Sequence, residues 1–252
     1  MKISGKVAIV TGGVSGIGKA VSLKLLENGA KLVAILDLEA ESCQAVVSEF
    51  FEKFGADRVR FIKCDVTRED QLKNSFQEAY DVYGALDIVV NNAGIISHDN
   101  RRTIEVNLIG VVNAAFIAEK LMTREKRSER GIIINTASTA GLMASPLLSA
   151  SYTASKHGVV GFTKSLVNST DEFSKDLRVV AVCPDGVETT FLTRCNFQTE
   201  EYKQRMKFHQ VENVFVSLDM VVDAFVLAIE DDSLHGAIIK VTKSDGIEVT
   251  NS

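Results

Sequence analysis

The stretch SYTASKHGVVGF, residues 151–162, places Tyr152 four residues before Lys156. Four residues along a helix turn the side chain by about 400°, so the two side chains share one helix face. A tyrosine with an ordinary pKa of about 10 rarely holds a phenolate near neutral pH, but a nearby ammonium favours the phenolate. The pair can therefore act as a general base. Many helices carry such a pair without a catalytic role, so its function depends on which other residues the chain brings to the phenol.

Two other polar residues could assist the phenol. Ser138 comes directly after the apolar run GIIINTA, where its hydroxyl could bond a substrate oxygen. Asn107 is a polar residue among apolar neighbours in TIEVNLIGVV, and its amide could bind a water that links Lys156 to solvent. Each residue also has a purely structural interpretation, because Ser138 could be an ordinary turn residue and Asn107 a satisfied amide of the core.

A glycine-rich segment, TGGVSGIG at 11–18, follows the first apolar run and opens a predicted helix. Glycines let the backbone approach a pyrophosphate, and the N-terminus of the helix offers free N–H groups to it. Such a string is weak evidence alone, but here it lies between a strand and a helix, as the mechanism requires. The segment therefore predicts a dinucleotide site rather than a mere tight turn.

An acidic residue follows the second apolar run, about 20 residues beyond the glycines, at the distance where a carboxylate bonds the adenosine ribose. This residue is Asp37, and neither Leu38 nor Ser15 brings a positive charge that would favour a 2′-phosphate. The pattern favours NAD over NADP, although Asp37 could instead be a solvated acid at a strand end. Asp65, in KCDVT, could accept a hydrogen bond from the adenine amino group or cap the helix that begins near Arg68.

Apolar runs alternate with stretches of helical periodicity along the whole chain. Seven runs are predicted as strands, at 6–12, 30–37, 58–66, 86–94, 131–138, 177–186 and 236–242. Helices are predicted at 18–29, from the end of the strand 30–37 through Phe54, at 69–84, and at about 104–120, 152–173 and 218–230. The strands are continuously apolar, as expected when helices cover both faces of a parallel sheet. We expect one α/β domain over residues 1–252, with a doubly wound (Rossmann) sheet of seven parallel strands and helices on both faces.

Composition excludes several other classes of protein. The net charge is −5 without a basic cluster, which argues against nucleic acid as a partner. No apolar run reaches the roughly 18 residues of a membrane-spanning helix, so we expect no membrane insertion. The four cysteines and four histidines have irregular spacing, which predicts reduced thiols, a cytoplasmic location and no metal site.

TGGVSGIG, NNAG, Asn107, Ser138 and YTASK occur in an order that resembles the short-chain dehydrogenase/reductase family across nearly the whole chain. The resemblance implies that Tyr152 is the general acid/base, that Lys156 lowers its pKa and holds the nicotinamide ribose, that Ser138 positions the substrate oxygen, and that Asn107 keeps a proton-relay water. Together, motif and resemblance assign the NAD contacts to Gly12, Gly13, Val14, Ser15, Gly16, Ile17, Gly18, Asp37, Leu38, Cys64, Asp65, Val66, Asn92, Ala93, Gly94, Tyr152, Lys156, Val187 and Thr189.

The chain departs from the family pattern in the region that should select the substrate. Asp185 stands where the family usually has the glycine of a Pro-Gly pair. Ser149 takes the position of a glutamine that contacts the substrate in lipid-oxidising members. The segment 190–216, the expected substrate lid, matches poorly. Its apolar residues could enclose a lipid-like substrate or simply pack on the sheet: Phe191, Leu192, Phe197, Tyr202, Met206, Phe208 and Phe215.

The predicted reaction is hydride transfer between NAD and a secondary alcohol or ketone, with a lipid-like hydroxy compound such as 15-hydroxyprostaglandin as substrate and with Ser138, Ser149 and Tyr152 as its contacts. One alternative is an NADH-dependent reductase of steroid or terpenoid ketones, and another is a catalytically quiet NAD-binding protein. The family resemblance also implies a homodimer, formed through helices at about 104–120 and 152–173.

Overall fold

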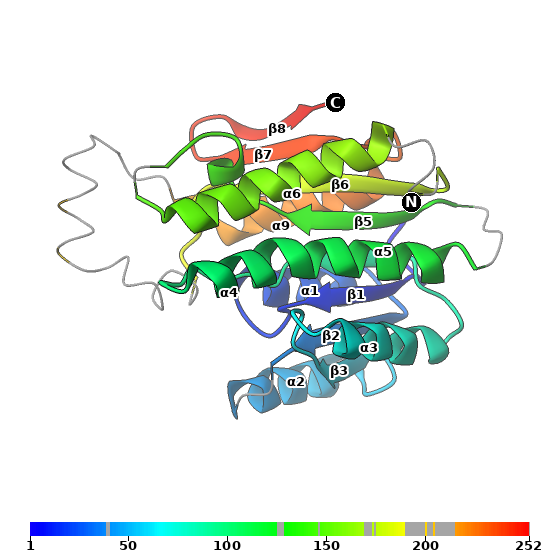
Figure 1. The fold of residues 1–252 in the computed structure, drawn as a ribbon. Coiled ribbons are helices and arrows are strands. Elements are labelled where there is room, and N and C mark those ends of the chain that lie inside the picture. Colours follow the sequence, from blue (N-terminus) through cyan, green and yellow to red (C-terminus); the bar gives the residue numbers. More distant parts are fainter. Residues whose placement is uncertain are drawn as a thin grey trace.

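The computed structural model describes residues 1–38, 41–124, 129–145, 147–168, 173, 175–189, 200, 204 and 215–251. Its core is one sheet with the strand order β3-β2-β1-β4-β5-β6-β7-β8 (Figure 1). The strands are β1 (Val7–Thr11), β2 (Leu32–Asp37), β3 (Val59–Lys63), β4 (Ile88–Asn91), β5 (Gly131–Thr136), β6 (Leu177–Pro184), β7 (Ile238–Thr242) and β8 (Gly246–Thr250). The order reverses after β1, so the prediction of a doubly wound α/β sheet is confirmed.

The prediction of seven parallel strands is wrong by one strand. β1 to β7 are parallel, but β8 pairs antiparallel with β7 and adds an eighth strand at the edge. A short turn with a positive φ of 72° at Gly246 joins the two strands. The side chains of β8 are half-buried or exposed. The strand was missed because it lacks the continuous apolar run that marks a strand covered on both faces.

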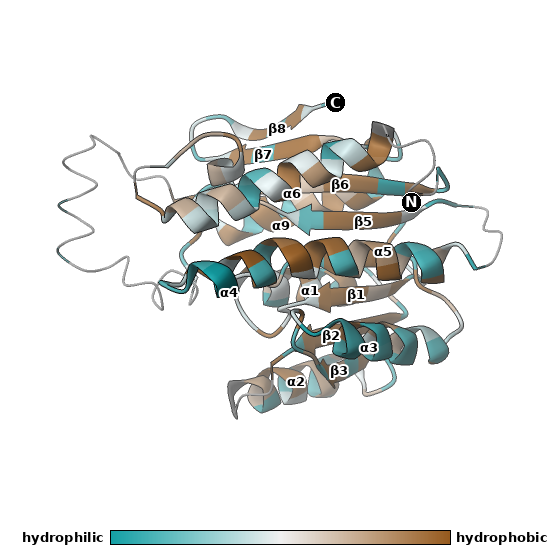
Figure 2. Cartoon of the chain, viewed as in Figure 1, coloured by the Kyte–Doolittle hydropathy of each residue, from teal (hydrophilic) through white to brown (hydrophobic). Residues whose placement is uncertain are grey.

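Helices cover both faces of the sheet. α1 (Gly16–Glu27), α2 (Glu41–Phe54) and α9 (Leu218–Glu230) share one hydrophobic core with the strands. α3 (Glu69–Asp81) and α5 (Gly110–Met122) pack on the opposite face, and α6 (Ala150–Asn168) lies beside them. Figure 2 shows apolar strands between these layers and hydrophilic residues along α3. This arrangement places the carboxyl ends of all parallel strands along one side of the molecule.

The helical run that leads into α5 begins earlier than predicted. It starts with α4 (Asn100–Ile104) and passes through a π-helical turn, η1 (Glu105–Ile109). The Asp99 carboxylate accepts a hydrogen bond from the backbone N–H of Arg102 (3.0 Å) and so caps α4. π turns are rare and often occur at functional sites, and this one contains Asn107.

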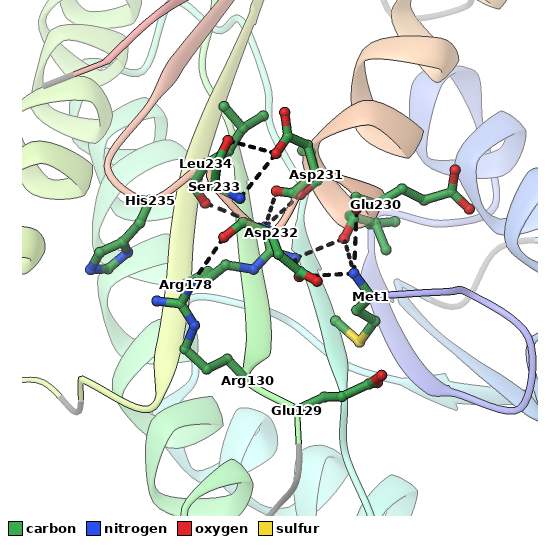
Figure 3. Close-up of polar contacts among 12 residues, drawn as sticks. Met1, Glu129, Arg130, Arg178, Glu230, Asp231, Asp232, Ser233, Leu234 and His235 are labelled. Atoms are coloured by element: carbon green, nitrogen blue, oxygen red, sulfur yellow. Dashed lines mark hydrogen bonds and ion pairs between the residues drawn. The ribbon is translucent and has the colours of Figure 1, made fainter.

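Arg178, near the start of β6, is fully buried although it carries a charge. Its guanidinium donates to the carbonyl oxygens of Ala228 (2.9 Å) and Ile229 (2.7 Å) at the end of α9, and to those of Asp231 and Leu234 in the turn that follows. Figure 3 shows this side chain beside the turn. Carbonyls at the end of a helix lack partners within the helix, so a single arginine here fixes α9 to β6.

Candidate active site

A cleft of about 510 Å³ runs along the carboxyl ends of the parallel strands. Ligands bind in this position in open α/β sheets. The cleft extends from the loop after β1, past the ends of β2 and β3, to the start of α6. Its lining includes the following predicted residues: Gly12, Ser15, Gly16, Ile17, Asp37, Leu38, Cys64, Asp65, Val66, Asn92, Ala93, Gly94, Ser138, Tyr152, Lys156, Val187 and Thr189.

The glycine loop has the backbone conformation that its composition predicts. Gly12 and Gly16 have positive φ angles of 64° and 52°, which other residues rarely adopt. A Cβ at Gly18 would lie 2.2 Å from the carbonyl oxygen of Gly12, so α1 packs too closely on the loop for any side chain there. Ser15 stands at the N-cap of α1, but its side chain makes no capping hydrogen bond within the described part of the chain. The N-terminus of α1 is thus suited to binding an anion.

Asp37 lies at the end of β2 and lines the same cleft. Its carboxylate accepts hydrogen bonds from the backbone N–H groups of Val14 (3.2 Å) and Leu38 (2.8 Å). The residue is half-buried, and its role towards a ribose stays a prediction. Its position beside the glycine loop fits the ribose of a dinucleotide, and its negative charge disfavours a 2′-phosphate.

Asp65 does not cap α3, because Arg68 stands at that N-cap. Its carboxylate instead accepts from the Thr67 N–H and hydroxyl and from the Arg102 guanidinium (2.9 Å). Partial burial favours the neutral acid, but these hydrogen bonds outweigh it and lower the pKa of Asp65. Arg102 also lines the cleft, and sequence reasoning missed it. No local pattern indicates that a residue of α4 will meet the end of β3.

Asn107 is fully buried and satisfied by protein groups. Its amide accepts from the Ile95 N–H (2.8 Å) and donates to the Ile95 carbonyl (2.9 Å) and to the Ser155 hydroxyl (3.2 Å). These contacts agree with the interpretation of Asn107 as a satisfied core amide. They also tie the loop after β4 to α6, which carries Tyr152. The role of Asn107 in holding a relay water stays a prediction.

Tyr152 and Lys156 point into the cleft from the first turns of α6 and are both buried. The Lys156 ammonium lies 5.7 Å from the centre of the Tyr152 ring and donates to the Thr136 carbonyl at the end of β5 (2.7 Å). Burial lowers the pKa of Lys156 to about 8. The hydrogen bond to Thr136 holds the lysine at the carboxyl end of β5, beside the tyrosine ring.

The two serines predicted to contact substrate differ in position. Ser138 lines the cleft, and its hydroxyl accepts from the Ala140 N–H (3.2 Å). Ser149 is not among the residues that line the cleft. Its hydroxyl accepts from the Tyr152 N–H (3.3 Å) at the start of α6. Ser149 therefore caps the helix that presents the phenol.

Some of the remaining predicted residues line the cleft and others do not. Gly13, Val14 and Gly18 belong to the glycine loop but do not line the cleft. Thr189 packs against the glycine loop, since a Cβ at Gly16 would lie 3.4 Å from the Cβ of Thr189. Of the lid segment 190–216, only Glu200, Gln204, Phe215 and Val216 are described, so most of that prediction lies outside the described residues. Phe215 lines the cleft.

The described residues also bear on metals and membranes. Among them, no cluster of three or more histidine, cysteine or carboxylate side chains could hold a metal ion. No helix within the described ranges is long and apolar enough to cross a membrane.

Comparison with known proteins agrees with this geometry. The family model described as short chain dehydrogenase matches residues 6–201. The chain is 38% identical to human 15-hydroxyprostaglandin dehydrogenase [NAD(+)] over 259 residues, covering 98% of this chain and 94% of the relative. It is 35% identical to a 3beta-hydroxysteroid dehydrogenase of Mediterraneibacter gnavus, covering 80% of this chain and 72% of that protein.

A comparison of folds gives a consistent result. The crystal structure of levodione reductase superposes with a TM-score of 0.82 over 96% of this chain and 98% of the other, at 23% sequence identity. Such a low identity shows a shared fold and nothing more. The match of the family model over most of the sequence, together with the relatives above 30% identity, confirms the predicted resemblance: the chain belongs to the short-chain dehydrogenase family.

Proposed function

We propose that this protein is an NAD-dependent alcohol dehydrogenase that oxidises a secondary alcohol on a lipid-like compound such as 15-hydroxyprostaglandin. The observation that carries the proposal is the meeting of Tyr152, Lys156 and Ser138 in the cleft that also holds the glycine loop and Asp37. When bound there, NAD accepts a hydride from the carbinol carbon.

The residues of the chain supply position and acidity. Ser138 donates a hydrogen bond to the substrate oxygen, and Tyr152 takes the hydroxyl proton as the carbinol becomes a ketone. The Lys156 ammonium favours the phenolate form of Tyr152, because an opposite charge nearby stabilises the ionised phenol. The Thr136 carbonyl keeps that ammonium in place (2.7 Å).

The cofactor contacts follow from the cleft. The glycine loop and the N-terminus of α1 would hold the pyrophosphate, and Asp37 would accept from the ribose hydroxyls. Cys64, Asp65, Val66, Asn92, Ala93 and Gly94 line the same cleft and would hold the adenosine half. Lys156, Val187 and Thr189 would hold the nicotinamide half. The carboxylate of Asp37 makes NAD, rather than NADP, the cofactor.

Two observations support a lipid-like substrate. The human relative, which covers nearly all of this chain, is named a 15-hydroxyprostaglandin dehydrogenase. The cleft also has apolar residues at its substrate end, including Leu147, Leu148 and Phe215. The 3beta-hydroxysteroid dehydrogenase among the relatives favours steroid alcohols or ketones as the second candidate class.

The direct test is NADH formation by purified protein with prostaglandins, steroids and short-chain secondary alcohols, each offered with NAD and with NADP. Turnover of a prostaglandin with NAD alone supports the full proposal. Turnover of steroids alone moves the substrate to the second class. If none of these alcohols reacts and no corresponding ketone is reduced with NADH, although NADH binds tightly, the protein is the catalytically quiet NAD-binding alternative.

Replacing Tyr152→Phe removes the proton acceptor but leaves the ring and its packing. We expect kcat to fall by about 10²–10⁴-fold, the range that general acid–base groups contribute. Affinity for NADH, followed by its fluorescence, should stay within about a factor of two, because the phenyl ring keeps its packing and the other cofactor contacts are unchanged. An equal loss of both quantities would mean that Tyr152 has been given the wrong role.

Two further proposals accompany this function. We propose that the protein is a homodimer, assembled through the outer faces of α5 and α6. A cytoplasmic location, suggested by the cysteine pattern, stays a prediction.

A further inference from the structure

Asp185 is the acidic residue that replaces the glycine of the family's usual Pro-Gly pair. It follows β6 directly, at the carboxyl end of the sheet, and lines the cleft together with Ser138 and Tyr152. The residue is half-buried. The proposed function gives it no role.

One of its two carboxylate oxygens is well satisfied. Oδ1 accepts from the Thr139 hydroxyl (3.2 Å) and from the Gly186 N–H (3.0 Å). For Oδ2, no hydrogen bond or ion pair is found among the described residues. Lys240, which also influences Asp185, is itself engaged by Asp245 (2.8 Å) and Glu248 (2.9 Å).

The Asp185 carboxylate is partly withdrawn from water at the wall of the cleft. Removing a charged group from water costs free energy unless hydrogen bonds or an opposite charge compensate. Burial accordingly raises the pKa of Asp185, against the opposing effect of its bonds from Gly186 and Thr139. The remaining oxygen can be satisfied by a donor that enters the cleft.

The neighbours of Asp185 indicate which molecule brings that donor. Its partner Thr139 directly follows Ser138, which holds the substrate oxygen in the proposed mechanism. Through Thr139, the Asp185 carboxylate is therefore one residue along the chain from the group proposed to hold the reacting oxygen, and both Ser138 and Asp185 line the cleft. Lys156, the group proposed to hold the nicotinamide ribose, donates its hydrogen bond to the Thr136 carbonyl on β5 and not to Asp185.

We propose that Asp185 is a specificity-determining residue that accepts a hydrogen bond from a second hydroxyl group next to the carbinol carbon. The preferred substrate is then a vicinal diol on a lipid-like chain, and an anionic group beside the carbinol is repelled. This inference rests on the proposed function, since it takes Ser138 and Tyr152 as the groups that hold the reacting oxygen, but it replaces the 15-hydroxyprostaglandin type of alcohol, whose carbinol carbon has no neighbouring hydroxyl group, with a diol.

The test compares two lipids that differ by one hydroxyl group, 9-hydroxyoctadecanoic acid and 9,10-dihydroxyoctadecanoic acid. Their affinities for the protein loaded with NADH are measured by titration calorimetry, and their oxidation with NAD is measured separately. We expect the wild type to bind the diol at least about tenfold more tightly, because a hydrogen bond to a charged acceptor contributes that much or more.

Asp185→Gly should abolish this preference by weakening diol binding alone, with affinity for the mono-alcohol and for NADH unchanged. Asp185→Asn keeps the size of the side chain and an acceptor but loses the charge, so it should retain part of the preference. Glu188→Ala is the matched control, because Glu188 is an exposed carboxylate three residues further on, outside the cleft lining. It should behave as the wild type.

Three results would overturn the inference: no diol preference in the wild type, an unchanged preference in both Asp185 variants, or a loss of NADH affinity that places Asp185 against the cofactor. Failure of the proposed function looks different. A wild type that binds the diol preferentially but oxidises no alcohol with NAD supports the role of Asp185 in binding and rejects the dehydrogenase.

Discussion

Lys156 shows how a single residue in this site couples function to stability. Its ammonium is buried, and within the described part of the chain it donates a hydrogen bond to the Thr136 carbonyl. Burial lowers the pKa of Lys156 from the ordinary value of 10.5 to about 8. Between these two values the unfolded chain binds more protons at this residue than the folded chain does. The contribution of Lys156 to the free energy of unfolding therefore rises with pH in that window.

Lys156→Met removes this titration. As the pH rises from 8 to 10, we expect the wild type to become more stable relative to the variant, as measured by urea unfolding at each pH. The difference between the two proteins cancels the groups that titrate in both and do not interact with Lys156. Lys164→Met changes an exposed lysine of the same helix and serves as the control. A difference that stays flat across this window would contradict the depressed pKa.

At the scale of elements, a chain of buried polar side chains fixes α6 against the sheet. Asn91 on β4 donates to Asn135 on β5 (2.9 Å), and Asn135 donates to the Thr163 hydroxyl on α6 (3.0 Å). Thr163 donates in turn to the Val159 carbonyl (2.9 Å). Each buried donor in this chain needs its partner, so the contacts set the height of α6 on the sheet. That height determines where Tyr152 enters the cleft.

Thr163→Val keeps the shape of the side chain but leaves the Asn135 amide without its acceptor. We expect the free energy of unfolding to fall by about 1–3 kcal/mol, the cost of an unsatisfied buried donor. Thr123→Val is a matched control, because the exposed Thr123 hydroxyl makes the same type of bond, to the Glu119 carbonyl (2.8 Å). Its effect should stay below about 0.5 kcal/mol, as is usual for surface substitutions. Equal losses in the free energy of unfolding, measured with denaturant, would show that the buried contact stabilises the protein no more than the exposed one.

At the scale of the whole molecule, the outer side of α5 and α6 remains partly apolar. Ile109 is 45% exposed at the end of the π turn, and Phe116 and Phe162 are half-buried with their ring centres 6.0 Å apart. Figure 2 shows apolar residues on the visible side of α5. Exposed apolar patches on a folded protein often mark an interface with another chain. Because α5 and α6 lie side by side, a second copy could cover both helices in a symmetric dimer.

Sedimentation equilibrium should therefore give a mass of twice 27.4 kDa. Ile109→Arg places a charge on the proposed interface and should shift the protein towards single chains. Val249→Arg, at a site 42% exposed on β8, is the control and should leave the mass unchanged. A wild-type mass of one chain would reject the dimer.

The amino-acid sequence by itself determined the fold class, the positions of the parallel strands and the identity of the family. These features follow from local information: continuous apolar runs mark strands covered on both faces, and the glycine loop and the Tyr152–Lys156 pair have fixed spacing along the chain. The prediction of strands was incomplete at one edge of the sheet. β8 was missed because an edge strand with exposed side chains has no continuous apolar run.

Only the tertiary structure decided which distant residues meet. The pairing of Arg102 with Asp65, the Thr136 carbonyl at Lys156 and the contact of Asp185 with Thr139 join segments from 20 to 46 positions apart. Such contacts depend on strand order and on how each helix is set on the sheet, and no local pattern encodes either. The same holds for Ser149, whose small polar side chain suits a substrate contact or a helix cap equally well. The fold makes it the cap of α6, because the Tyr152 N–H at the first turn needs a partner.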